Sequence, residues 1–166
     1  GMEIEAFCHG ALCVSISGQC EMSSYIGGRS GNRGSCAQPC RKRYGIEDEK
    51  GNSLLERGYL LSPRDLRTID SVKELADAGV YSFKLEGRMK SPEYVAAVTR
   101  NYDLALNGKA YDQGEMAQMF NRSYTKGLGF GAFGHDFVST KRPNHRGLAI
   151  GKVDEKGKIC WNTVPD

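Results

Sequence analysis

The chain has 166 residues, of which 39% are hydrophobic and 26% are charged, and its formal net charge is +3. This composition is that of a soluble globular protein with a core of its own. The apolar runs are far too short to span a membrane and no secretory signal is visible, so we expect a cytoplasmic location and no membrane partner.

Four cysteines dominate the first third of the chain. A short strand is expected at residues 3–7, and Cys13, Cys20, Cys36 and Cys40 follow it with the spacing C-x6-C-x15-C-x3-C. Zinc and iron–sulfur clusters both select thiolate sulfur, and four thiolates from one glycine-rich loop are enough for either. Two disulfides are the alternative, which a cytoplasmic location disfavours.

The same loop is strongly basic. Between Met22 and Ile46 there is no aspartate or glutamate, and the cations in this window are Arg29, Arg33, Arg41, Lys42 and Arg43. We interpret Arg29, Arg33 and Arg41 as candidate ligands for an anion, either RNA phosphate or a small dicarboxylate. A solvated surface loop is the alternative interpretation.

The middle of the chain shows an alternation of strands and helices. Residues 58–61 predict a short buried strand, and a helix is expected to open at Ser62-Pro63 and to end at Gly79. A second strand is expected at 80–85, followed by a helix from Ser91-Pro92 to Asn107-Gly108. Strand–helix–strand–helix with short connections predicts parallel α/β structure, which fits two units of a (β/α) barrel.

Charged side chains gather where the second strand ends. Lys84 and Glu86 alternate on that strand, and Arg88 and Lys90 follow in the next loop. They predict a rim that binds a carboxylate or RNA, with Glu86 orienting the cations, or a rim held only by salt bridges. Glu86 and His9 are the candidate catalytic residues; His9 would donate a proton or contact substrate, or would only support the loop.

The last part of the chain is less regular. Residues 109–145 are expected to form an extended linker, in which the glycine-rich run 127–134 packs aromatic rings on the barrel. Three alternating residues in this linker could stack a base and hold phosphate, or form a polar strand edge: Arg122, Tyr124 and Lys126. Residues 146–161 predict a β-hairpin that opens a C-terminal β domain.

These patterns divide the chain into four parts. We expect a cysteine-rich cluster-binding segment at 1–57, βαβα barrel units at 58–108, the linker at 109–145, and the start of a β domain at 146–166. The fold class is therefore α/β, a partial TIM-like barrel. Because two or three strands cannot close such a barrel, we expect a fragment of a larger enzyme that forms a dimer or larger oligomer through its exposed edges.

Several stretches together resemble peptidase family U32, the collagenase-like proteases. They are EAFCHGALC at 5–13, NRGSCAQPCR at 32–41, KLEGRMKSPEY at 84–94 and FNRSYTKG at 120–127. The resemblance implies a [4Fe-4S] cluster on Cys13, Cys20, Cys36 and Cys40, with zinc as a possible replacement. Cys8 and Cys160 fall outside the matching positions, and we expect both to be free buried thiols.

The resemblance also implies a function. Members of the family take part in hydroxylating an RNA base, with prephenate implicated, so the expected function is hydroxylation of a tRNA uridine. The expected partners are then RNA and a small anion such as prephenate. Alternatives are a collagenase-like peptidase and a non-catalytic scaffold with structural zinc, and the isolated fragment is expected to be inactive.

Overall fold

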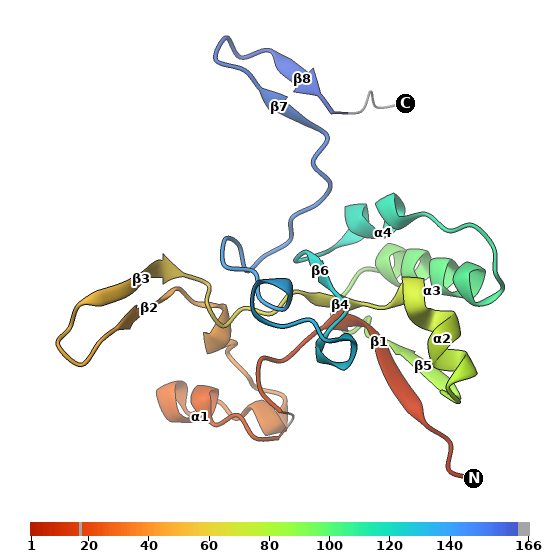
Figure 1. The fold of residues 1–166 in the computed structure, drawn as a ribbon, viewed down its shortest axis with the longest axis horizontal. Coiled ribbons are helices and arrows are strands. Elements are labelled where there is room, and N and C mark those ends of the chain that lie inside the picture. The colour runs from red at the N-terminus through yellow and green to blue at the C-terminus, as the bar shows by residue number, and fades with distance from the viewer. Residues whose placement is uncertain (17, 163–166) are drawn as a thin grey trace.

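A four-stranded mixed sheet forms the centre of the molecule. The computed structural model describes residues 1–16 and 18–162 (Figure 1). The sheet has the strand order β5-β1-β4-β6, in which β1 is parallel to β5 and antiparallel to β4, and β4 is parallel to β6. The strands are β1 (Glu5–Ala11), β4 (Asp65–Arg67), β5 (Ser82–Leu85) and β6 (Tyr124–Thr125).

Strand β1 is irregular near its end. Its pairing register with β5 shifts between Phe7 and His9, so the usual alternation is interrupted and Cys8, His9 and Gly10 are all buried. Gly10 has φ +130°, and a Cβ atom there would lie 2.7 Å from the Cβ atom of Glu86. The bulge and this close approach turn the His9 side chain into the molecule and bring Glu86 against β1.

Helices cover one side of this sheet. The helices α2 (Val72–Asp77), α3 (Pro92–Leu106) and α4 (Gln113–Met119) gather beside the sheet, away from α1 (Figure 1). A 3-10 turn at Ile69–Ser71 leads into α2. The hydrophobic core lies between the helices and the sheet and consists of Cys8, Ile69, Val72, Tyr94, Val98, Tyr102 and Met116. No helix in the described part of the chain is long and apolar enough to cross a lipid bilayer.

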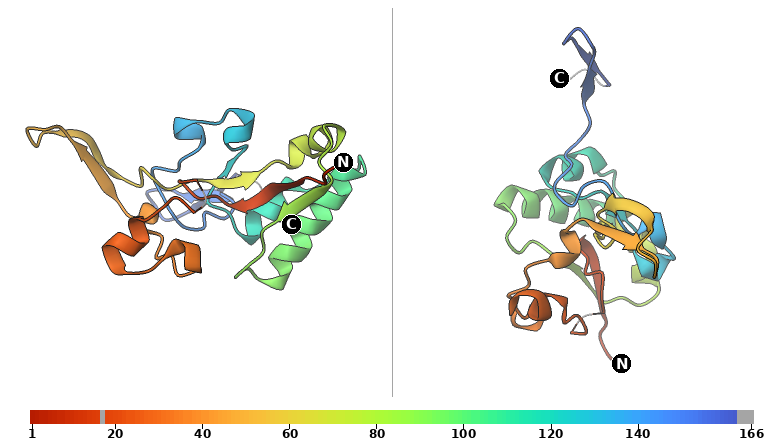
Figure 2. Two further views of the ribbon diagram at one scale, coloured as in Figure 1. Left: turned by 90° about the horizontal axis from the view of Figure 1, so that it is seen from below. Right: turned by 90° about the vertical axis from the view of Figure 1, so that its left-hand side faces the viewer.

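The cysteine segment lies outside this core. It contains α1 (Met22–Gly27) and 3-10 turns at Gly31–Arg33 and Pro39–Arg41, and it leads into a hairpin of β2 (Tyr44–Glu47) and β3 (Ser53–Gly58). Figure 2 shows that this hairpin projects from the body of the molecule. The segment after β6 folds into 3-10 turns at Leu128–Phe130 and Gly134–Asp136.

The C-terminal hairpin is confirmed. The strands β7 (Gly151–Val153) and β8 (Ile159–Trp161) pair antiparallel around a turn, in which the Asp154 carboxylate accepts hydrogen bonds from the N–H groups of Lys156 and Lys158. The hairpin stands away from the rest of the molecule (Figures 1 and 2). The glycine-rich run 127–134, expected to be extended, instead contains one 3-10 turn and ends where the second begins.

The expected strand at 58–61 and the helix from Ser62-Pro63 are wrong in their boundaries. Strand β3 ends at Gly58, β4 occupies part of the expected helix, and the α-helix begins only at Val72. Leu66 has helical spacing with Ile69 and Val72, which suggests a helix. Pairing of residues 65–67 with β1 and β6 instead places them in the sheet. By contrast, the expected strand and helix at 80–108 are present as β5 and α3.

The barrel expectation is confirmed only as mixed α/β structure. Among the described residues no sheet is closed, and the antiparallel pairing of β1 with β4 departs from the all-parallel barrel pattern. Because β1 pairs with strands on both sides, the expected division at residue 57 passes through one sheet. The domain division itself stays a prediction.

Candidate metal centre and its surroundings

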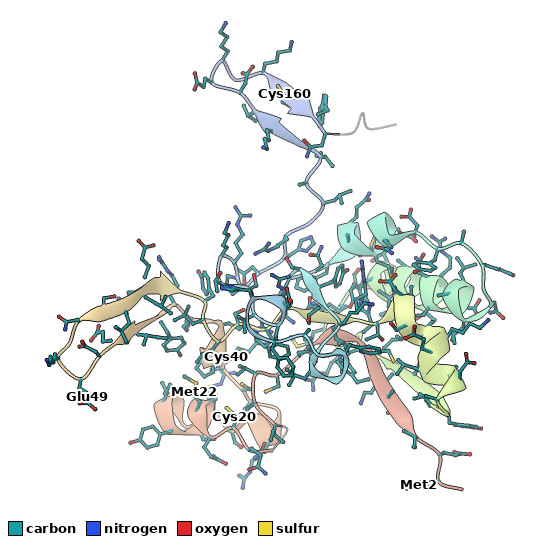
Figure 3. All side chains as sticks on the ribbon, in the orientation of Figure 1. Met2, Cys20, Met22, Cys40, Glu49 and Cys160 are labelled. Carbon is teal, nitrogen blue, oxygen red and sulfur yellow. The ribbon has the colours of Figure 1, made fainter. Side chains whose placement is uncertain are left out.

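The four cysteines of the spacing pattern line one cavity. Its volume is about 180 Å³, and its wall contains Cys13, Cys20, Cys36 and Cys40 together with Val14, Met22 and Pro39. Cys20 and Cys40 are half-buried, whereas Cys13 and Cys36 are exposed. Figure 3 shows Cys20 and Cys40 near α1, far from Cys160. The four cysteines picked out by their spacing in the sequence therefore surround a common space in the structure, which we call the cysteine cavity.

The other two cysteines lie elsewhere. Cys8 is buried in the core as expected, and its thiol donates to the carbonyl oxygen of Ala6 at 3.4 Å. Cys160 lies on the β7–β8 hairpin and is exposed, so the expectation that it is buried is wrong. The hairpin carries that thiol to the surface because its strands pair only with each other.

Glycines and a few hydrogen bonds shape the cysteine cavity. The helix α1 ends at Gly28 with φ +65°, and Gly34 turns the chain again with φ +74°. The Ser23 hydroxyl accepts the N–H of Ala37 at 2.9 Å, and the Cys36 sulfur accepts the N–H of Gln38 at 3.3 Å. The backbone–backbone hydrogen bonds described in this loop join residues within six positions, so a group held by the four thiols would add long-range order.

The spacing of the thiols bears on which group fits them. No set of three His, Cys, Asp or Glu side chains in the described ranges is close enough to hold a single metal ion. Tetrahedral zinc with Zn–S bonds of about 2.3 Å holds its sulfurs about 3.8 Å apart, so these thiols would have to move inward to bind it. The ligand number, the ligand type and the shared cavity fit a thiolate-ligated cluster of several atoms.

The charge around the cavity is uneven. Burial raises the pKa of the Cys40 thiol, Arg41 lowers it, and the nearby Cys13, Cys36 and Cys20 raise it further. Four thiolates in one place therefore repel one another, and Arg41 supplies the compensating positive charge. Burial lowers the pKa of Arg41 to about 10, so its guanidinium remains charged at neutral pH.

Arg41 also connects the cysteine loop to the sheet. Its guanidinium donates to the carbonyl oxygen of Leu12 at 3.3 Å, to the hydroxyl of Ser62 at 2.7 Å and to the carbonyl oxygen of Pro63. Leu12 directly precedes Cys13, and Ser62 and Pro63 precede β4. Arg41 thus holds both ends of the cysteine loop against the sheet.

Arg29 and Arg33 are the other two expected anion ligands. Both are exposed on the cysteine loop, and the Arg29 Nε donates to the carbonyl oxygen of Ser35 at 2.9 Å. Unlike Arg41, these two arginines present charge to the solvent. Either could reach an anion approaching the outside of the loop.

His9 lies in a cluster of aromatic rings. Its ring centroid is 6.0 Å from that of Tyr94, 5.5 Å from that of Tyr102 and 5.7 Å from that of Tyr124. The side chain is 1% exposed, and neither ring nitrogen has a hydrogen-bond partner. Burial lowers the pKa of His9 to about 4, against the opposing attraction of Asp65, so the imidazole is neutral at pH 7.

A buried ion pair lies beside His9. The Arg122 guanidinium donates to the Asp65 carboxylate, with Nε–Oδ1 and Nη2–Oδ1 distances of 2.8 and 2.7 Å, and the Arg122 N–H donates to Oδ2 at 3.0 Å. These three bonds join β4 to the segment just before β6. The sequence did not point to Asp65, which was expected only in the first turn of a helix.

The charged residues near the end of β5 have different surroundings. Lys84 and Arg88 are exposed, Glu86 is half-buried and its carboxylate accepts the Arg88 N–H at 2.9 Å. The Lys90 ammonium lies 3.0 Å from the centroid of the Phe120 ring. Only Glu86 touches His9, through a backbone bond of 2.8 Å from its N–H to the His9 carbonyl oxygen.

The family follows from a sequence match. The profile of peptidase family U32 matches residues 1–136, which include all four cysteines of the cavity, His9 and the Asp65–Arg122 pair. The chain belongs to peptidase family U32. No solved structure matches the chain significantly.

Relatives within the U32 family carry different names. A collagenase of Porphyromonas gingivalis is 41% identical over 78% of this chain, and the 23S rRNA 5-hydroxycytidine C2501 synthase of Escherichia coli is 41% identical over 87%. The tRNA hydroxylation protein P1 of Bacillus subtilis is 37% identical over 67%. The chain spans 39%, 21% and 28% of these relatives, respectively.

Proposed function

We propose that this U32 chain carries the cluster-binding part of an enzyme that hydroxylates an RNA base, most specifically a tRNA uridine. The observation that carries the proposal is the convergence of Cys13, Cys20, Cys36 and Cys40 on one cavity. Two relatives named for hydroxylation of rRNA and tRNA support it. Because the chain spans less than half of each relative, the proposal concerns the activity of a longer enzyme, the parent, of which this chain would be a part.

The residues around the cysteine cavity would have two separate roles, cluster binding and charge compensation. Cys13, Cys20, Cys36 and Cys40 would hold a [4Fe-4S] cluster, which when bound supplies electron transfer at the cavity. Arg41 fixes the ends of the loop and offsets the negative charge of the thiolates.

The exposed cations would bind the substrates. Arg29 and Arg33 lie on the outer side of the same loop, where phosphate groups of RNA can reach them. Lys84 on β5 and Arg88 in the loop after it are exposed, and they would bind a small anion such as prephenate. Zinc in place of the cluster would keep the loop folded without supplying electrons.

His9 suits a role that needs a neutral imidazole. Its low pKa keeps the ring neutral at pH 7, so one ring nitrogen can accept a hydrogen bond. Since the ring is 1% exposed, any contact with substrate requires the tyrosine rings around it to move. The half-buried Glu86 accepts the backbone N–H of Arg88, so it would support the loop that carries this cation.

A collagenase-like peptidase is the second candidate, favoured by the name of the Porphyromonas gingivalis relative. Peptidases that use a side-chain nucleophile pair it with a base. In the part of the chain that the structure describes, no histidine hydrogen-bonds a serine, threonine or cysteine side chain; His145 bonds only the backbone of Asn121. We keep hydroxylation as the first candidate because of the cysteine cavity.

The test compares RNA from cells that lack the parent gene with RNA from complemented cells. Mass spectrometry of tRNA and rRNA nucleosides should show loss of one hydroxylated pyrimidine, restored by the wild-type gene and by Cys160→Ser but not by Cys36→Ser. Unchanged nucleosides in the deletion strain would refute the proposal. Cleavage of collagen by the purified parent, lost in Cys36→Ser, would favour the peptidase instead.

A further inference from the structure

A second cavity adjoins the cysteine cavity. Its volume is about 310 Å³, and it lies between β1 and β4 on one side and the segment from Lys126 to Phe137 on the other. Leu12 and Cys13 form part of its wall, and Cys13 also lines the cysteine cavity. A group held by the four thiols would therefore lie next to the contents of this second cavity, which we call the Phe130 cavity.

Aromatic rings and aliphatic side chains form most of the wall of the Phe130 cavity. Phe7 comes from β1, Leu66 from β4, and Phe130 and Phe137 from the segment that covers the sheet. That segment approaches closely because Gly127 has φ +78° and a Cβ atom there would lie 2.8 Å from Cδ1 of Leu66. Such a wall suits a flat ring that stacks on aromatic side chains.

A basic hollow continues from the Phe130 cavity. It has a volume of about 290 Å³ and shares Lys126 and Phe130 with the Phe130 cavity. Its wall also contains Arg64 and Asp136. Lys126 is the charged residue that lines the apolar cavity, and with Arg64 it gives the neighbouring hollow two cations against one carboxylate. A flat apolar space beside a basic one matches a nucleotide, with its planar base and anionic phosphate.

We propose that the Phe130 cavity takes a pyrimidine base of single-stranded RNA, turned out of its strand and stacked on the aromatic wall, with its phosphate at Lys126 and Arg64. This inference rests on the proposed function and names the place where the substrate base would lie. The cavity is at the small end of ligand pockets, about 300 to 1,000 Å³, which favours a single ring. The Escherichia coli relative named for 5-hydroxycytidine agrees with a pyrimidine.

Binding of a labelled hexauridylate to the purified protein tests the stacking contact. Fluorescence anisotropy should show that Phe130→Ala weakens binding about 5- to 150-fold, the range that one stacked base is worth. Phe133→Ala is the matched control, because Phe133 lies on the same segment, is 66% exposed and does not line the cavity. An oligonucleotide with abasic sites should bind the wild type and Phe130→Ala equally.

Salt titrations test the phosphate contact. The slope of log affinity against log salt concentration should fall by about 1 in Lys126→Gln and stay unchanged in Lys141→Gln, an exposed cation outside both cavities. Hexauridylate containing 4-thiouridine should also cross-link, on irradiation, to a peptide from residues 126–137.

Three results would overturn the base pocket. The first is equal affinity of Phe130→Ala and Phe133→Ala for uridylate, and the second is the absence of any uridylate binding. The third is a lower melting temperature in Phe130→Ala with unchanged affinity, because that result would identify the cavity as an internal packing surface. Failure of the proposed function is seen separately in the deletion strain. If nucleosides change there while the two variants bind alike, only the base pocket is wrong.

Discussion

At the scale of single residues, Arg41 should contribute both to stability and to metal binding. Arg41→Gln removes a charge beside Cys40 and breaks bonds to Leu12, Ser62 and Pro63. We expect the free energy of unfolding to fall by about 1–3 kcal/mol, because buried acceptors lose their partner. Metal content per chain should fall as well.

Denaturant unfolding and elemental analysis measure these two effects. The control is Arg33→Gln, since Arg33 is exposed on the same loop. Equal stability and equal metal content in the two variants would contradict the role assigned to Arg41.

His9 predicts a dependence of stability on pH. Its pKa is lowered from 6.5 to about 4 by burial, so between these values the unfolded chain binds a proton that the folded chain does not. The free energy of unfolding should therefore fall as the pH is lowered from 6.5 to 4, by about 3 kcal/mol from this residue. Above pH 6.5 the contribution of His9 is constant.

Urea unfolding across this pH range tests the prediction. His9→Gln should remove about 3 kcal/mol of the loss, whereas His135→Gln, at an exposed site, should keep it. The quantity compared is the change in the free energy of unfolding between pH 6.5 and 4. The test therefore remains valid even if His9→Gln lowers stability by a constant amount at every pH. Parallel pH profiles for wild type and His9→Gln would show that His9 does not titrate in this way.

The residue scale also shows what sequence could predict. The spacing of Cys13, Cys20, Cys36 and Cys40 identified residues that the structure brings to one cavity, because thiolate chemistry restricts their uses. The ion pair of Asp65 with Arg122 was missed, since the two lie 57 positions apart and no local pattern connects them. Likewise, the tyrosines around His9 lie far from it in the sequence: Tyr94 and Tyr102 come from α3 and Tyr124 from β6.

At the scale of elements, local signals were reliable only where they were strong. Helix α3 was expected from Ser91-Pro92 and Asn107-Gly108, and it begins and ends there because capping is a local interaction. The strand β4 was missed because its three residues are held by pairing with β1 and β6, which sequence does not show. Short strands of this kind depend on tertiary structure more than on propensity.

The cap of α3 is a test at this scale. The Ser91 hydroxyl accepts the N–H of Tyr94 at 3.3 Å, and Tyr94 belongs to the core. Ser91→Ala should lower the free energy of unfolding by about 1 kcal/mol, whereas Ser91→Asp should preserve it, because a carboxylate also caps. Thermal or urea unfolding decides, and equal losses in both variants would mean that the cap contributes little.

At the scale of the whole molecule, the four cysteines should act as one unit. Changing any one of Cys13, Cys20, Cys36 and Cys40 to serine should release metal and loosen the loop, because metal binding in such a loop is also folding free energy. Cys160→Ser is the control on a distant hairpin. Metal stoichiometry measures the effect; unchanged content in two of the four variants would contradict a shared site.

Association of two copies stays a prediction. The strands β5 and β6 are edges of the sheet, and each pairs on one side only. Four apolar side chains near the helices add little surface for association, because Leu66, Ile69 and Val98 are buried and Val95 is 43% exposed. We still expect a dimer through an edge, and light scattering across a concentration series would reveal a monomer if the edges are protected.

The local bonding of the cysteine loop has a consequence for the lifetime of the protein. Cys13 and Cys36 are exposed, and the backbone–backbone hydrogen bonds described between them join residues no more than six positions apart. Without metal, this loop should open far more often than the core, so a protease would cut there first. Limited proteolysis with and without a chelator would show this, and in a cell starved of iron the empty protein would be degraded before the loaded one.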